Sequence, residues 1–110
     1  MGEVGTVSKK IRLVIDSVVD DLARISLSSE NNRTTLNVNA DSLRAILGRN
    51  SIEEGKTYLL TLDDLEDYKD VWSGTFDNSY QFHGNKKIED TTEQDLKTIR
   101  KRLKRLRRLR

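Results

Sequence analysis

Four short segments of this chain place apolar residues at every second position, which is the pattern of a β-strand with one buried face. The segments cover residues 10–16, 22–27, 34–38 and 57–62. Polar, turn-forming residues separate the first three segments, so we expect an antiparallel meander. The side chains expected to be buried are Ile11, Leu13, Ile15, Ala23, Ile25, Leu27, Leu36, Val38, Tyr58, Leu60 and Leu62.

A short helical segment is expected after the third strand. Asp41 is suited to cap the N-terminus of a helix over residues 42–47, and Gly48 stands where a left-handed C-terminal residue belongs. The apolar side chains of this helix would plug one end of a curved sheet. The sequence therefore predicts a mainly β fold with some α structure, namely a small antiparallel β-barrel of the SH3 or OB type with a helical plug.

Size and composition limit the kind of protein that this chain can be. It has 110 residues, of which 35% are hydrophobic and 35% are charged, so we expect one domain with a small core. The absence of cysteine excludes disulfides and thiolate metal sites. Since there is neither an apolar run of about 18 residues nor a secretory signal, we expect a cytoplasmic protein.

Residues 63–87 are interpreted as an aromatic and acidic insertion within a barrel domain that covers residues 1–90. Residues 71–76 and 80–82 are expected to form a hairpin, followed by a loop over residues 83–87. The acidic side chains would form either a solvated loop or a patch that faces a basic protein partner, because they lack the spacing of a calcium-binding loop. These side chains are Asp63, Asp64, Glu66, Asp67 and Asp70.

Four aromatic residues of the insertion allow two interpretations. They could offer stacking platforms to single-stranded bases, as on OB-type barrels. Alternatively, they could form a satellite core beneath the predicted hairpin, which is the interpretation that we favour from the sequence. The residues are Trp72, Phe76, Tyr80 and Phe82.

A basic helix is expected over residues 91–110. Thr91, followed three residues later by Gln94, predicts a capping box at its start. Leucine and isoleucine residues at steps of three and four give it one apolar stripe, through which a homodimer could form. The stripe consists of Leu96, Ile99, Leu103, Leu106 and Leu109.

The charges of the chain are strongly segregated. Residues 97–110 hold nine Lys and Arg and no acid, whereas residues 1–96 hold 11 bases and 18 acids. The sequence therefore predicts non-sequence-specific association with RNA or DNA through phosphate contacts. The alternatives are that the basic helix docks on the acidic body or is a solvated helix end. The residues predicted to bind phosphates are Arg100, Lys101, Arg102, Lys104, Arg105, Arg107 and Arg108.

The sequence favours a binding protein over an enzyme. His83 is the only histidine, the glycines are scattered, and no nucleophile, metal cluster or cofactor motif is recognisable, so neither a cofactor nor a metal is expected. The alternative function is a protein-interaction module, or a phage-type inhibitor, that uses the acidic barrel surface against a protein partner.

The order of these features resembles that of a known family. The features are a strand ending in an Ile-Asp pair, an acidic turn, two further strands, a Glu-Gly turn and an acidic lead into a basic helix. This order is similar to a family of short, functionally uncharacterised prokaryotic proteins, over residues 11–62 and 88–110. The resemblance implies a small barrel with a basic helical tail, of prokaryotic or phage origin, and it implies nothing about activity, because the family has no settled one. The chain departs from the pattern at Ser17, where arginine is usual, and at the insertion of residues 64–87.

Overall fold

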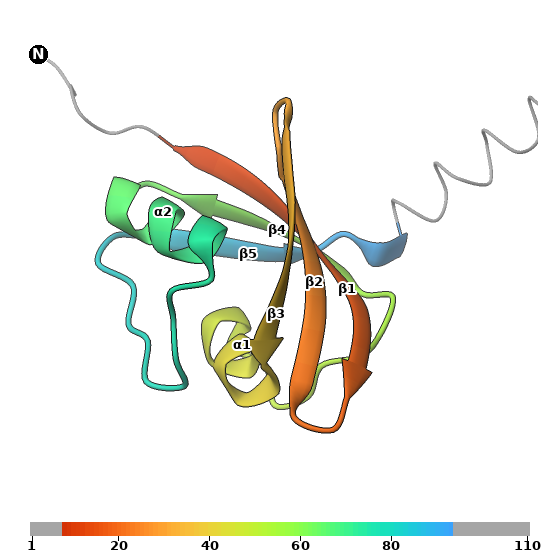
Figure 1. Ribbon diagram of the computed structural model, residues 1–110. Coiled ribbons are helices and arrows are strands. Elements are labelled where there is room, and N and C mark those ends of the chain that lie inside the picture. Colours follow the sequence, from red (N-terminus) through yellow and green to blue (C-terminus); the bar gives the residue numbers. More distant parts are fainter. Residues whose placement is uncertain (1–7, 94–110) are drawn as a thin grey trace, which may run out of the picture.

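The computed structural model describes residues 8–93 and shows one sheet of five antiparallel strands with two helices on the same side of it (Figure 1). The strands lie in the order β3-β2-β1-β4-β5. The fold is therefore mainly β, as predicted. Its elements are β1 (Lys9–Val19), β2 (Leu22–Ser29), β3 (Asn32–Asn39), α1 (Ala40–Leu47), β4 (Thr57–Leu62), α2 (Leu65–Ser73) and β5 (Lys86–Asp90).

The first four predicted strands are confirmed as β1 to β4, and their register explains the alternation in the sequence. Leu13 of β1 lies opposite both Leu27 of β2 and Tyr58 of β4. Directly opposed residues of antiparallel strands share a face, so the apolar side chains gather on one side. The turns are tighter than expected, because Asp20 and Glu30 adopt positive φ angles of 55° and 52°.

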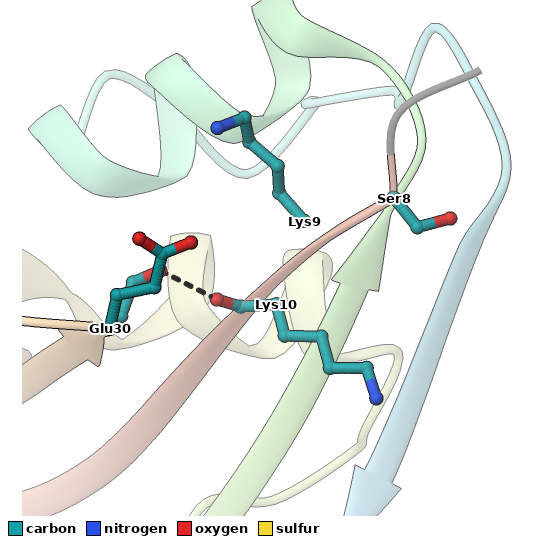
Figure 2. A pocket seen from close by; sticks show the side chains of 5 residues that line it. Ser8, Lys9, Lys10 and Glu30 are labelled. Atoms are coloured by element: carbon teal, nitrogen blue, oxygen red, sulfur yellow. Dashed lines mark hydrogen bonds between the residues drawn. The ribbon is translucent and has the colours of Figure 1, made fainter.

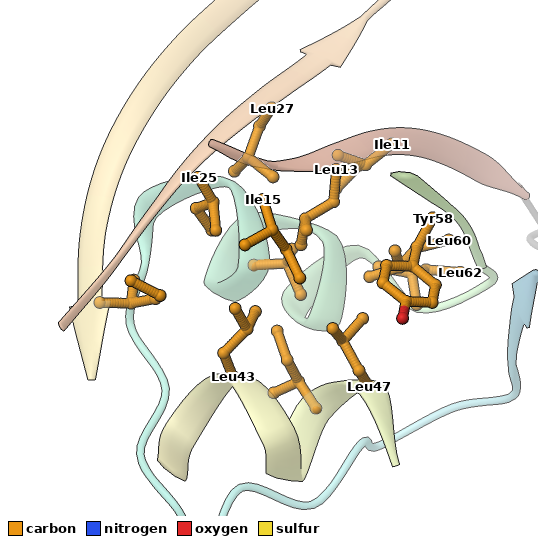
Figure 3. Packing of buried hydrophobic residues seen from close by; sticks show 14 residues of the cluster. Ile11, Leu13, Ile15, Ile25, Leu27, Leu43, Leu47, Tyr58, Leu60 and Leu62 are labelled. Carbon is orange, nitrogen blue, oxygen red and sulfur yellow. The ribbon is translucent and has the colours of Figure 1, made fainter. Parts of the chain in front are cut away.

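The hydrophobic core lies between the sheet and the two helices (Figure 3). Strands β1, β2 and β4 contribute most of it, and α1 adds Leu43, Ile46 and Leu47 as predicted for a plug. Val71 of α2 is also fully buried in this cluster. Burial of apolar surface is the main stabilising contribution to such a fold.

The prediction of a closed barrel is wrong, because β3 and β5 are the two edges of an open sheet. Helix α2 packs on the core side of the sheet, next to the end of β2 and to the edge strand β3. The Tyr68 hydroxyl is 3.4 Å from the Ser29 hydroxyl at the end of β2, and a Cβ added at Gly74 would lie 3.2 Å from Leu36 of β3. The segment between β4 and β5 thus takes the position where strand pairing would have closed a barrel.

The predicted hairpin over residues 71–82 is also wrong, since its first residues belong to α2. Helix-capping signals outweigh the β-propensity of the Val-Trp pair here. Asp64 caps the N-terminus by accepting a hydrogen bond from the Asp67 amide at 3.0 Å, and Gly74 ends the helix with a left-handed φ of 77°. Residues 74–85 then form an irregular loop.

The two ends of α1 differ in how well the sequence predicts their capping residues. Gly48 is left-handed, with a φ of 64°, as predicted. The N-terminal cap is Asn39 rather than Asp41, because the Asn39 side chain accepts hydrogen bonds from the amides of Asp41 and Ser42 at 2.8 and 3.4 Å. Asp41 instead lies in the first turn, where its charge favours the helix dipole.

The loop predicted over residues 83–87 ends two residues earlier, because β5 begins at Lys86, and it also starts earlier, at Gly74. This strand pairs with β4 and places Ile88 opposite Leu60. The predicted C-terminal helix lies outside the described residues, apart from its first positions. Within residues 8–93, no helix is long and apolar enough to cross a membrane.

Candidate functional site

The most elaborate group of polar contacts in residues 8–93 surrounds Asp67, whose side chain is fully buried in the first turn of α2. Its Oδ1 accepts hydrogen bonds from the Tyr80 hydroxyl at 3.0 Å and from the backbone amide and Nδ1 of His83, both at 2.9 Å. Its Oδ2 accepts one from the Gly84 amide at 2.9 Å. A single carboxylate thus holds the loop of residues 74–85 against the helix.

These donors determine the protonation of the group. Burial by itself would raise the pKa of Asp67, but the hydrogen bonds from His83, Gly84 and Tyr80 outweigh it, so the pKa is lowered. The hydrogen bond to Asp67 raises the pKa of His83 and outweighs the opposing effect of desolvation. Burial and the carboxylates of Asp67 and Asp70 raise the pKa of Tyr80. The site is therefore a buried carboxylate whose ionised form is stabilised by hydrogen-bond donors from the loop.

The remaining acids of the predicted acidic patch are distributed between the interior and the surface. The Asp70 carboxylate accepts a hydrogen bond from the Tyr80 hydroxyl at 3.0 Å, and Asp63 accepts two from Asn85, at 2.7 and 3.0 Å. Asp64 caps α2, and Glu66 is the exposed member of these five acids. Most of these carboxylates thus hold the loop in place.

The approach of the loop to α2 is close at Gly84. A Cβ added there would lie 2.7 Å from the Asp64 Cβ and closer still to the Asp63 carboxylate. In the sequence this glycine resembles any other loop residue. Its steric role depends on the distance between two segments about 20 residues apart, which local sequence does not show.

The aromatic residues of the insertion are partly buried and pack against the hydrophobic core. Tyr80 makes edge-to-face contacts with Phe76 and Phe82, at centroid distances of 6.4 and 5.1 Å. Trp72 stacks on Tyr68 at 6.3 Å. These contacts are those of the satellite core, while base stacking by the same rings stays a prediction.

Asp64, Asp67 and His83 bring potential metal-ligand atoms within 4.8 Å of one another. The oxygens of Asp67 already accept four hydrogen bonds, and His83 Nδ1 is the donor in one of them. Structural hydrogen bonding therefore accounts for this cluster. Among residues 8–93, no buried side-chain nitrogen or oxygen lacks a hydrogen-bond partner.

The opposite side of the sheet carries no described helix, and we call it the open face. Most of its side chains are polar, although Val14 and Leu59 also lie on it. Five of the side chains are exposed bases that were not among the predicted site residues. The sequence could have indicated some of these basic side chains, because in β1 they alternate with buried isoleucine and leucine. The bases are Lys10, Arg12, Arg24, Arg33 and Lys87.

Two hollows lie where β1 and β2 separate. One, of about 360 Å³, lies beside Ser8, Lys9 and Glu30 (Figure 2). The other, of about 290 Å³, is lined by Lys10, Arg12, Ser28, Ser29, Glu30 and Leu59 and opens on the open face. Lys9 and Lys10 point to opposite sides of β1 (Figure 2), and the Lys9 ammonium lies 5.1 Å from the Tyr68 ring centre.

The residues predicted to bind phosphates, Arg100 to Arg108, lie outside the described residues, so their contacts stay a prediction. The described part shows instead where the other charges are. Residues 8–93 hold 16 acids and 11 bases, and five of the bases are on the open face. No protein-family model, no curated protein and no solved structure matches this chain.

Proposed function

We propose that this chain is a non-enzymatic binding protein that associates with nucleic acid through phosphate contacts from its basic C-terminal residues. The segregation of charge carries the proposal, because residues 97–110 hold nine bases and no acid. Six of these bases are arginine, whose planar guanidinium forms paired hydrogen bonds with phosphate. Such contacts give affinity without sequence preference and a strong dependence on salt.

The polar cluster around Asp67 anchors the loop that follows α2. Its carboxylate accepts hydrogen bonds from His83 Nδ1 and from the amides of His83 and Gly84. The proposal of a non-enzymatic protein rests on the segregation of charge and makes no use of this cluster. The hollows are shallow and lie among exposed lysine, serine and glutamate side chains.

The proposal is tested by reversing two charges in the full chain, Arg105→Glu together with Arg108→Glu. Binding to fluorescently labelled duplex and single-stranded RNA and DNA would be followed by anisotropy at two salt concentrations. We expect weaker binding, and a slope of log affinity against log salt that is flatter by about 0.9 for each duplex phosphate that is no longer neutralised. Lys69→Glu is the control, since it reverses one exposed charge on α2. Affinity equal to that of the unchanged chain would exclude the tail as the binding site.

A protein-interaction module is the second candidate, and one observation favours it. Val19 and Leu22 flank the β1–β2 turn and are 65% and 58% exposed, with Asp20 and Asp21 between them. An apolar pair next to acids suits a partner with basic and apolar side chains. This candidate would gain support if the full chain failed to bind any nucleic acid.

A further inference from the structure

We infer that the open face of the sheet is a second nucleic-acid contact surface, which docks the phosphate backbone of a duplex. The inference rests on the proposed function and names a part of the folded body that takes part in it. What carries it is the placement of exposed bases in adjacent cross-strand rows, together with a hollow between them.

The register places the bases in two neighbouring rows. One row runs across all five strands from Arg33 through Ser28, Arg12 and Leu59 to Glu89. The next contains Lys10, Thr61 and Lys87. Because neighbouring strands are about 5 Å apart, bases two strands apart are separated by roughly 10 Å in each row. Four positive groups thus lie on one part of the face.

Charge is sorted between this face and the rest of the folded body. The open face holds five bases and three acids, Asp16, Glu30 and Glu89, whereas the rest of residues 8–93 holds six bases and 13 acids. Glu89 lies 3.8 Å from the Lys87 ammonium, so it offsets part of that charge. A body with excess acid therefore presents one positive surface. Such a surface attracts a polyanion and orients it relative to the protein.

The hollow on this face has the chemistry of a phosphate contact. Lys10 supplies an ammonium group, Arg12 a guanidinium and Ser28 a hydroxyl, which are all groups that commonly bind phosphate oxygens. The Ser29 hydroxyl already donates to the Lys10 carbonyl oxygen at 2.9 Å and fixes the two strands at this point. Glu30 also lines the hollow, and its charge opposes an anion.

The composition of the face favours a duplex over a single strand. Single strands bind proteins largely by stacking their bases on aromatic rings. No aromatic side chain of residues 8–93 lies on the open face, since the rings of α2 and the following loop pack against the core on the other side. Hydroxyl and amide side chains lie between the lysine and arginine side chains instead. Such groups contact phosphate and sugar without recognising the nucleotide sequence. They include Ser26, Thr35, Asn37 and Thr61.

The test uses the full chain, a labelled mixed-sequence duplex and the corresponding single strand. Arg33→Gln and Lys87→Gln each remove one base from an exposed position at a sheet edge. We expect each to weaken duplex binding by roughly threefold and to flatten the salt slope by about 0.9. Lys69→Gln removes the same charge from α2 on the other side and should leave both values unchanged.

Glu30→Gln tests the hollow on the open face, because this substitution should raise the affinity for duplex, whereas the two preceding substitutions should lower it. Removal of the opposing carboxylate should strengthen duplex binding by roughly threefold, an effect that a merely destabilised variant would not show. On addition of duplex, the NMR chemical shifts of the backbone amides should change at open-face positions of β1, β2 and β3. They should stay constant in α2.

The possible outcomes separate this inference from the proposed function. If the unchanged chain binds duplex but Arg33→Gln, Lys87→Gln and Glu30→Gln all bind like it, the open face is not a contact surface and the basic tail alone carries binding. If the unchanged chain binds no nucleic acid, both proposals fall. If the three substitutions alter only single-strand binding, the assignment to a duplex is wrong.

Discussion

On the helix-covered side of the sheet, the buried Asp67 and the half-buried Asp63 and Asp70 accept hydrogen bonds from the loop that follows α2. On the open face, basic side chains stand exposed beside hydroxyl and amide groups. Asp67 illustrates the first arrangement with four accepted hydrogen bonds, and Arg33 illustrates the second with an exposed position on an edge strand. The contrast separates charged side chains that hold a loop in place from charged side chains that stay exposed, and the latter are those that we propose to contact a partner.

The sharpest test of this contrast is Asp67→Ala, which should produce the largest effect on stability. It removes the acceptor for the amides of His83 and Gly84, so these donors lose their partner, whereas the Tyr80 hydroxyl keeps Asp70 as its acceptor. We expect the free energy of unfolding to fall by about 2–4 kcal/mol. Urea denaturation monitored by Trp72 fluorescence would measure it. Glu66→Ala, one residue earlier and exposed, should change it by less than about 0.5 kcal/mol. Equal effects would show that Asp67 is not the anchor.

A change of pH should have a smaller effect on the free energy of unfolding, because Asp67 and His83 form a hydrogen-bonded pair of titratable groups. The pKa of His83 is raised by Asp67, so its contribution to stability is complete below the unfolded pKa of about 6.5 and is lost as pH rises through the folded value. The pKa of Asp67 is lowered, so its contribution is lost only as pH falls below its ordinary value of 3.8. The pair should therefore stabilise the fold most between these limits.

The pH effect would be measured by recording the midpoint of urea unfolding at a series of pH values from acid to alkaline. The unchanged chain would be compared with His83→Gln as the matched variant. The variant should lose the decline in stability on the alkaline side. The change should be modest, because the His83 side chain is 62% exposed and a neutral imidazole protonated at Nδ1 still donates to Asp67. A decline of the same size in both proteins would assign it to other groups.

The smallest effect on stability is expected on the open face. Arg33→Gln should shift the free energy of unfolding by less than about 0.5 kcal/mol, because an exposed base on an edge strand adds little to folding. Thermal or urea unfolding alongside the binding measurement would check this. A loss comparable to that of Asp67→Ala would mean that open-face charges support the fold, and the contrast between the two sides would disappear.

Three helix ends show which features of the fold can be predicted from neighbouring residues and which cannot. The left-handed conformation of Gly48 is predicted correctly, because a helix end depends on neighbouring residues. The cap falls on Asn39 rather than Asp41, since two polar residues close together fit the same pattern and only the backbone selects between them. The end of the helix over Leu65–Ser73 is predicted as a strand, although Asp64 and Gly74 are residue types that commonly cap helices.

Alternation and composition alone specify the four strands, their buried faces, the helical plug and the segregation of charge, because these are properties of neighbouring residues. Tertiary packing was needed to show that the sheet stays open, that α2 packs on its core side and that Asp67 anchors the loop. It also places bases from β1, β3 and β5 on one face, because strand order and register bring together residues as far apart as Lys10 and Lys87. Such relations depend on long-range pairing, which no local pattern of residues specifies.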